Sequence, residues 1–311
     1  MKKLLIPFAI AISIYSCDDV VDIPLKDAEP IMTVDAWLNH TSDTQRIVLT
    51  YTRPYFDNTA PTPVLNAEVA IGVLDNNSLV DTLYFTDENA DGVYEWIPPS
   101  GEKFGEIGQS YALQIEALGN TYNAFSTMND VPPVDSITFE YNEKDAFITE
   151  DWYYGEFWSR DLDGLGDTYW IKAYKNDTLL SEPEQMNLAF DASFSFGYEN
   201  DSLPFIQPIR TAVNPFDDAP DQPSPYEIGD RLKVEIYAIT NEAWFFLTRV
   251  RDETVRNPGF AQLFANPLSN VPTNIISDDE EVEVVGFFSV ASVSSLEVTM
   301  SEDNIVDRIP D

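Results

Sequence analysis

The segment Ile31-Met32-Thr33-Val34-Asp35-Ala36-Trp37-Leu38 places an apolar side chain at every second position. This alternation predicts a β-strand, because successive side chains of a strand point to opposite faces. Residues 45–52 repeat the pattern after a polar turn at residues 40–44, which predicts an antiparallel partner strand. The folded part of the chain is therefore expected to begin with two paired strands.

The same alternation continues at regular spacing through the next part of the chain. Further strands are predicted at residues 64–74, 79–86, 93–97, 110–118 and 121–127. Glycine, asparagine, aspartate or proline occupies most of the gaps, and Gly119-Asn120 is typical of a tight hairpin. Short strands at this spacing predict an antiparallel, Ig-like β-sandwich over residues 30–130.

The prolines of Val131-Pro132-Pro133-Val134 interrupt the pattern and predict a domain boundary, because paired prolines cannot lie inside a central strand. Strand patterns resume at residues 136–141, 153–158, 168–174, 189–196, 231–239, 282–290 and 294–299. Residues 131–311 are therefore predicted to form a second antiparallel sandwich. It is expected to carry one α-helix at residues 241–257, capped by Thr240 or Asn241, and a long proline-rich surface loop at residues 200–225. The predicted fold class is all-β.

The N-terminus has the organisation of an export signal. Two lysines precede an apolar run at residues 4–14, which at about 11 residues is too short to span a bilayer. Ile14-Tyr15-Ser16-Cys17 follows and resembles a bacterial lipobox. We therefore predict a lipoprotein signal peptide at residues 1–16, acylation (palmitate) at Cys17, and an acidic tether at residues 17–29. The alternative is an ordinary signal peptide with a chance cysteine nearby.

The chain of 311 residues is strongly acidic, with 54 Asp and Glu residues against 17 Lys and Arg and a net charge of −37. This field excludes nucleic acid as a partner, because phosphates would be repelled. Anionic lipid head groups are excluded for the same reason, so membrane attachment is expected to depend on acyl chains.

The residue types needed for common catalytic sites are scarce. His40 is the only histidine and Cys17 the only cysteine, which excludes a zinc site of ordinary composition. His40 lies in a polar turn, which favours a loop residue over the base of a catalytic triad. Pairs of carboxylates are too numerous to single out a glycoside hydrolase site. We therefore expect a protein that is not an enzyme.

Two acidic loops are candidates for calcium binding. The segment Asp87-x-Asn89-x-Asp91-Gly92 matches the first half of an EF-hand loop, but Pro98 replaces the glutamate at position twelve. The segment Asp161-x-Asp163-Gly164-x-Gly166-Asp167 is similar to aspartate-rich calcium loops of extracellular repeat modules. The alternative for both loops is an acidic turn without metal.

Aromatic residues gather at residues 152–158, with Trp170 on the next predicted strand. Trp152, Tyr154 and Trp158 are candidates for a surface on which sugar rings stack. The alternative is core packing, since alternation directs about half of these rings inward.

Several motifs occur together in a fixed order along the mature chain. They are the lipobox and acidic tether, the 31–38 strand, Pro63-Val64-x-x-Ala67-x-Val69, Gly92-x-Tyr94, Gly108-x-x-Tyr111-x-Leu113-x-Ile115, the 131–137 junction, a late helix, Asn266-Pro267, Thr273-Asn274-Ile275 and Gly286-Phe287-Phe288. This ordered set resembles the DUF4249 family of Bacteroidetes lipoproteins. The resemblance implies a surface-exposed outer-membrane lipoprotein that serves as an accessory binding subunit of a TonB-dependent transporter. The alternative is a free-standing calcium- or glycan-binding surface protein or adhesin.

Overall fold

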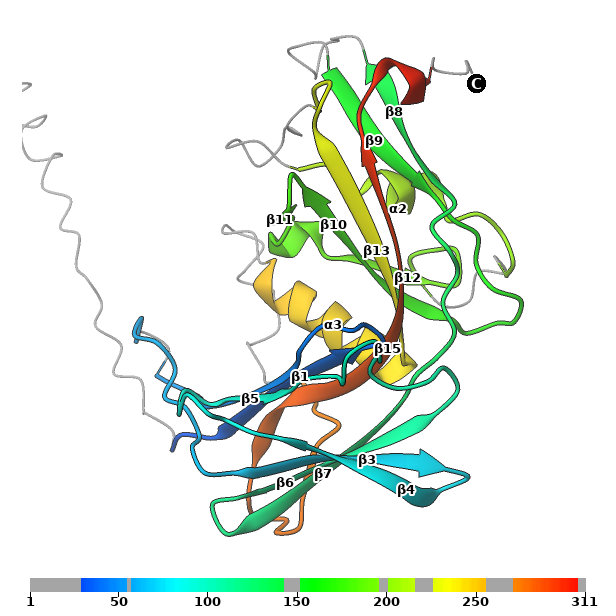
Figure 1. Cartoon of the computed structure of the whole chain (residues 1–311). Coiled ribbons are helices and arrows are strands. Elements are labelled where there is room, and N and C mark those ends of the chain that lie inside the picture. The colour runs from blue at the N-terminus through cyan, green and yellow to red at the C-terminus, as the bar shows by residue number, and fades with distance from the viewer. Residues whose placement is uncertain are drawn as a thin grey trace, which may run out of the picture.

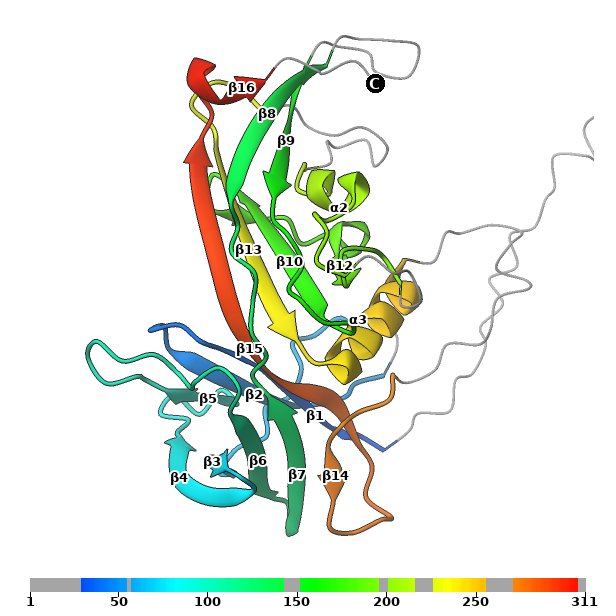
Figure 2. The ribbon, with the colours of Figure 1, turned by 90° about the vertical axis from the view of Figure 1, so that its right-hand side faces the viewer.

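A computed structural model describes residues 29–54, 57–142, 152–195, 201–215, 226–255 and 271–306. Strands dominate these residues and form three sheets, of eight, five and three strands. The predicted all-β fold with packed sheets is confirmed. Figures 1 and 2 show the five-stranded sheet at one end of the molecule and the three-stranded sheet at the other end.

The eight-stranded sheet has the strand order β11-β10-β13-β15-β1-β2-β5, and β12 pairs with β10 outside this path. Its strands are β1 (Met32–Asn39), β2 (Gln45–Tyr51), β5 (Val93–Trp96), β10 (Thr168–Lys175), β11 (Thr178–Leu179), β12 (Asn187–Phe190), β13 (Arg231–Ile239) and β15 (Val284–Thr299). β1 and β2 are antiparallel neighbours, as their alternating patterns predicted.

Strand β15 joins the two halves of the molecule. Its first half pairs with β1 in parallel, and its second half pairs with β13 in the antiparallel sense. Gly286 lies opposite Val34 in the parallel pair, with a φ of +106°. A Cβ at this position would collide with the carbonyl oxygen of Val34, so only glycine fits.

The other two sheets are smaller. The five-stranded sheet has the order β14-β7-β6-β3-β4, and the three-stranded sheet the order β16-β8-β9. Their strands are β3 (Glu68–Asp75), β4 (Ser78–Phe85), β6 (Ser110–Ala117), β7 (Asn120–Thr127), β14 (Ile276–Ser277), β8 (Ser136–Asn142), β9 (Trp152–Trp158) and β16 (Ile305–Val306). Leu118 and Gly119 both have positive φ between β6 and β7, which gives the tight hairpin that the sequence predicted.

Each small sheet covers a different half of the same face of the large sheet. Phe288 and Val290 of β15 belong to the first core, under the five-stranded sheet. Leu296 and Val298, which have the same parity along β15, pack against the second core under the three-stranded sheet. Residue 131, the predicted boundary, begins the segment that builds the second core. The segment from Ile275 to Val290 then returns to the first core.

Helix α3 (Asn241–Thr254) covers the opposite face of the large sheet near the junction of the two halves (Figure 1). Thr240 caps the helix, because its hydroxyl accepts a hydrogen bond from the backbone N–H of Ala243 at 3.3 Å. Trp244 and Leu247 of the helix pack with Phe287 of β15 in a third apolar cluster. The predicted helix and its cap are therefore present, with the helix ending at Thr254, and residues 256–257 of the predicted range lie outside the described residues.

Residues 201–215 differ from the surface loop predicted there. They contain the short helix α2 (Gln207–Thr211), and Phe205, Ile209 and Val213 are fully buried in the second core. The proline content suggested a loop, but the apolar residues between the prolines pack against β9 and β12. Two 3-10 helices complete the described elements, η1 (Pro183–Gln185) and η3 (Glu302–Asn304).

Candidate functional site

A lysine surrounded by aromatic rings and carboxylates lies on the face of the large sheet that carries α3. Alternation along β10 sends Tyr169, Ile171 and Ala173 into the second core. Trp170 and Lys172 therefore point to the opposite face. Together with neighbours from β1 and β13 they form the group that we call the lysine cluster: Asp35, Trp37, Trp170, Lys172, Glu235 and Tyr237.

The aromatic members of the lysine cluster are held by packing. Trp37 meets Trp170 edge to face, with ring centroids 5.5 Å apart, and stacks on Phe287 at 5.6 Å. Phe246 of α3 lies 6.1 Å from Trp37 and 4.6 Å from Phe287. The rings beneath the lysine are thus part of the contact between the sheet and the helix, which fixes their positions.

The ammonium group of Lys172 lies over two of these rings. Its Nζ is 3.9 Å from the centroid of Trp170 and 4.3 Å from that of Tyr237, both within the range of cation–π attraction. Burial lowers the pKa of Lys172 to about 8, although Glu235 and Asp35 oppose the shift. Among the described residues, no carboxylate lies close enough to Lys172 to form a salt bridge.

The two carboxylates near Lys172, those of Glu235 and Asp35, differ in their exposure to solvent and in their hydrogen-bond partners. Glu235 is buried and accepts hydrogen bonds from the hydroxyls of Tyr237 at 2.7 Å and Tyr174 at 3.1 Å, and it pairs with Lys233. Burial opposes ionisation, but these partners hold the pKa of Glu235 below its ordinary value. Asp35 is accessible to solvent, yet the surrounding protein still raises the pKa of its carboxyl group.

The lysine cluster is suited to binding. Lys172 offers a positive charge to an anionic group, the aromatic rings offer apolar surface, and Asp35 offers a nearby acceptor. Trp170 was predicted from the sequence as part of an aromatic group, whereas Lys172 was not predicted. The available signal was the run of Trp170, Lys172 and Tyr174 at alternate positions of one strand, which places the lysine on the same face as two aromatic residues.

The first predicted calcium loop lies between β4 and β5 and uses its carboxylates for its own backbone. Asp87 accepts hydrogen bonds from the N–H of Asp91 at 3.2 Å and of Gly92 at 3.0 Å. Asp91 accepts one from Val93, and Asn89 is exposed. These contacts are typical of an acidic turn.

The second predicted calcium loop is more closely packed. Asp161 is buried, and its Oδ1 accepts a hydrogen bond from Tyr169 at 2.7 Å, while its Oδ2 has no partner. Burial, with a contribution from Asp167 and Asp191, raises the pKa of Asp161 to about 7. Asp191 accepts hydrogen bonds from the N–H groups of Gly166 and Asp167.

Asp163 of the same loop accepts a hydrogen bond from the hydroxyl of Ser202 at 2.6 Å. Throughout the described ranges, no three Asp, Glu, His or Cys side chains come close enough together to hold a metal ion. Both acidic loops use carboxylate oxygens as acceptors of hydrogen bonds from the protein.

The predicted aromatic surface on β9 is only partly open. Phe157 is buried, whereas Trp158 is 37% exposed. The Trp158 indole donates to Thr138 at 3.1 Å, and the Arg210 guanidinium lies 4.2 Å from its ring centroid. Tyr154 donates to Glu140. The side chain of Trp152 lies outside the described part of the chain.

His40 is held by the backbone of a neighbouring loop. Its Nδ1 lies 2.9 Å from the carbonyl oxygens of both Phe104 and Gly105. A ring nitrogen this close to two carbonyl oxygens acts as a hydrogen-bond donor. These backbone contacts are those expected of a histidine that holds a loop in place.

The membrane anchor and the family were also predicted. Cys17 and most of the acidic tether lie outside the described residues. In the part that the structure describes, no helix has the length and apolar character needed to cross a membrane. A family model described as a domain of unknown function (DUF4249) matches residues 18–297. No curated protein matches the chain.

Proposed function

The chain belongs to the DUF4249 family, and we propose that it is a surface-exposed, lipid-anchored protein of a Bacteroidetes outer membrane. In this proposal it serves as an accessory binding subunit of a TonB-dependent transporter and is not an enzyme. The apolar run, the lipobox-like segment and Cys17 support the anchor. Several acyl chains on one cysteine would hold the protein firmly at the membrane.

The observation that carries the binding role is Lys172 between Trp170 and Tyr237. Burial of a charged lysine costs free energy, and its lowered pKa reflects that cost. A residue kept in the folded state at such a cost is a candidate for function. The ligand that fits best has an anionic group next to an apolar or planar part, so that the charge meets Lys172 and the remainder meets the rings.

Exposure on the cell surface can be tested with an epitope tag after Asp311 and an antibody that cannot cross membranes. Intact cells should bind the antibody as strongly as lysed cells. Binding only after lysis would place the protein on the inner leaflet and overturn the proposed orientation.

A free-standing surface protein that binds calcium or glycans is the second candidate. The unpartnered Oδ2 of buried Asp161, with Asp167 and Asp191 nearby, favours the calcium form, and the accessible Trp158 favours the glycan form. Calcium that binds only the folded state would raise the melting temperature, and Asp161→Asn should reduce that rise. Equal melting temperatures in millimolar calcium and in EDTA would eliminate the calcium form.

A further inference from the structure

The five-stranded sheet has an outer face that no other described element covers. Val69 and Ile71 of β3 point into the first core, as do Tyr111 and Leu113 of β6. The residues between them on both strands therefore point outward. This outer face lies at the end of the molecule farthest from β8 and β9 (Figures 1 and 2).

The centre of this face is made of small residues. Gly72 of β3 pairs with Ala112 of β6, and Ala70 lies two residues away on the same face. A Cβ on Gly72 would lie 2.8 Å from Cδ1 of Leu79, so the Leu79 side chain rests directly on the glycine. Ala70, Gly72, Ala112 and Leu79 thus form a low apolar floor across β3 and β6, which Gln114 borders opposite Ala70.

Large exposed apolar side chains stand on either side of the floor. Tyr84 of β4 pairs with Ala70, and Phe125 of β7 pairs with Ala112. Tyr84 is 71% exposed and Phe125 67% exposed. Contiguous exposed apolar residues of this kind mark interaction surfaces more often than isolated ones do.

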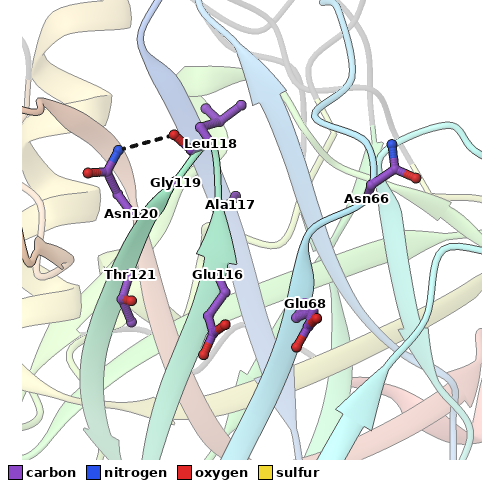
Figure 3. A pocket seen from close by; sticks show the side chains of 8 residues that line it. All are labelled: Asn66, Glu68, Glu116, Ala117, Leu118, Gly119, Asn120 and Thr121. Atoms are coloured by element: carbon purple, nitrogen blue, oxygen red, sulfur yellow. Dashed lines mark hydrogen bonds between the residues drawn. The ribbon is translucent and has the colours of Figure 1, made fainter.

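One end of the same face carries two facing carboxylates. Glu68 of β3 lies directly opposite Glu116 of β6, and like charges in that position destabilise a sheet. Figure 3 shows both side chains projecting from neighbouring strands into a pocket of about 410 Å³ that also includes Thr121. Within the described residues, neither carboxylate forms a salt bridge. None of the five strands contains Lys, Arg or His.

We infer that this outer face binds an extended polypeptide segment that carries Lys or Arg next to apolar side chains. The basic group would enter the pocket of Glu68 and Glu116, and the apolar group would rest on the floor between Tyr84 and Phe125. Gly72 lies four positions after Glu68 along β3, which is about 13 Å at roughly 3.3 Å per residue. An extended segment along β3 would therefore place its basic residue about four positions from its apolar anchor.

The charge of the face selects this partner over two others. A second copy would bring an equally acidic surface, and anionic lipid would bring phosphates, so both would be repelled. The inference goes beyond the proposed function, because it does not depend on which membrane complex contains the chain.

Site-specific photo-crosslinking in the native cells tests the inference. p-Benzoylphenylalanine replaces Phe125 in the full-length protein, and in a control protein it replaces Leu165, which is 71% exposed outside the outer face. Position 125 should give one polypeptide adduct, and mass spectrometry of the joined peptide should find Lys or Arg about four residues from the attachment site.

Charge variants complete the test. In the Phe125 crosslinker protein, Glu68→Gln with Glu116→Gln should reduce the adduct about tenfold, because complementary charges accelerate and stabilise association. The matched pair Glu102→Gln with Glu302→Gln, at exposed positions elsewhere, should leave the yield unchanged. Equal adduct yields at positions 125 and 165 would overturn the inference, as would an adduct with lipid, with the chain itself or with a second copy. An adduct yield that does not change when Glu68 and Glu116 are replaced would also overturn it.

Discussion

Nζ of Lys172 lies 3.9 Å from the centroid of the Trp170 indole, on the face of the sheet that carries α3. Both residues belong to β10 and are two positions apart, so the strand itself sets their relative position. The cation is placed over the ring before any ligand arrives. Such preorganisation reduces the entropy cost of binding.

Lys172→Met is expected to stabilise the protein at pH 7. Burial lowers the pKa of Lys172 to about 8 from an ordinary value of 10.5, so below pH 8 the folded state carries a costly charge. Methionine removes that cost, and the free energy of unfolding should rise by about 1–2 kcal/mol.

The same variant should lose its advantage at higher pH. Between pH 8 and 10.5 the unfolded chain binds more protons at Lys172 than the folded chain does, so the wild type gains stability as pH rises. Urea denaturation at pH 7 and pH 9.5 measures the difference in the free energy of unfolding between Lys172→Met and the wild type, which should be smaller at pH 9.5. Lys103→Met, at an exposed loop position, is the control and should show no such trend. A Lys172→Met protein less stable than the wild type at pH 7 would refute the cost assigned to this lysine.

Asp161→Asn is expected to stabilise the protein at neutral pH. Burial raises the pKa of Asp161 to about 7, so the folded state binds more protons than the unfolded chain between pH 3.8 and 7. The wild type therefore loses stability as pH rises through that window. An amide at this position can still accept the hydrogen bond from Tyr169.

Asp161→Asn should raise the free energy of unfolding by about 2 kcal/mol at pH 7.5, and this increase should vanish near pH 4. Calorimetric melting in EDTA measures it, with Asp163→Asn, an exposed neighbour, as the control. A gain that is constant over this pH range would show that Asp161 does not titrate as described.

Gly286→Ala is expected to disrupt the joint between the two halves. The new Cβ would collide with Val34, and the backbone at φ +106° disfavours any side chain. The free energy of unfolding should fall by more than about 3 kcal/mol, or the variant should fail to fold. Gly119→Ala is the matched control, because it shares a positive φ but has no atom near its Cβ position, and it should cost only about 1 kcal/mol. Equal losses in urea denaturation would mean that strain, and not contact with β1, explains Gly286.

Cys17→Ala tests the anchor. Without an acyl chain, the mature protein should leave the membrane fraction for the soluble fraction. Cell fractionation and intact-mass measurement of the wild type provide the readout. An unchanged membrane fraction, together with a mass that lacks acyl groups, would contradict a lipoprotein.

Local patterns predicted most of the strands, because the period of two and the turn residues are local signals. Two predictions were wrong in their bounds: residues 282–290 and 294–299 belong to one continuous strand, β15, and the strand predicted at residues 189–196 ends at residue 190. The β6–β7 hairpin at Gly119 and the α3 cap at Thr240 are examples. Long-range pairing was not predictable in this way. Nothing in the sequence of β15 indicates that its first half pairs in parallel with β1. Only Gly286 reflects this contact, because a side chain there would collide with Val34.

The candidate site was less predictable than the fold. The lysine cluster joins β1, β10 and β13, which are distant in sequence, so the closeness of Asp35, Lys172 and Glu235 depends on the sheet order. The burial of Phe205 and Ile209 was not predicted either, because the prolines around them indicated a surface loop. Their burial depends on tertiary contacts with β9 and β12 and not on local propensity.

The most direct test of the proposed role is the composition of the native complex. The tagged full-length protein is purified from outer membranes of its own host in mild detergent, beside Cys17→Ala as a control that should not reach the membrane. We expect a TonB-dependent transporter to be recovered with the wild type in fixed proportion, as measured by native mass spectrometry. Recovery of the wild-type protein alone, as a monomer without a transporter, would contradict the proposed role as an accessory subunit.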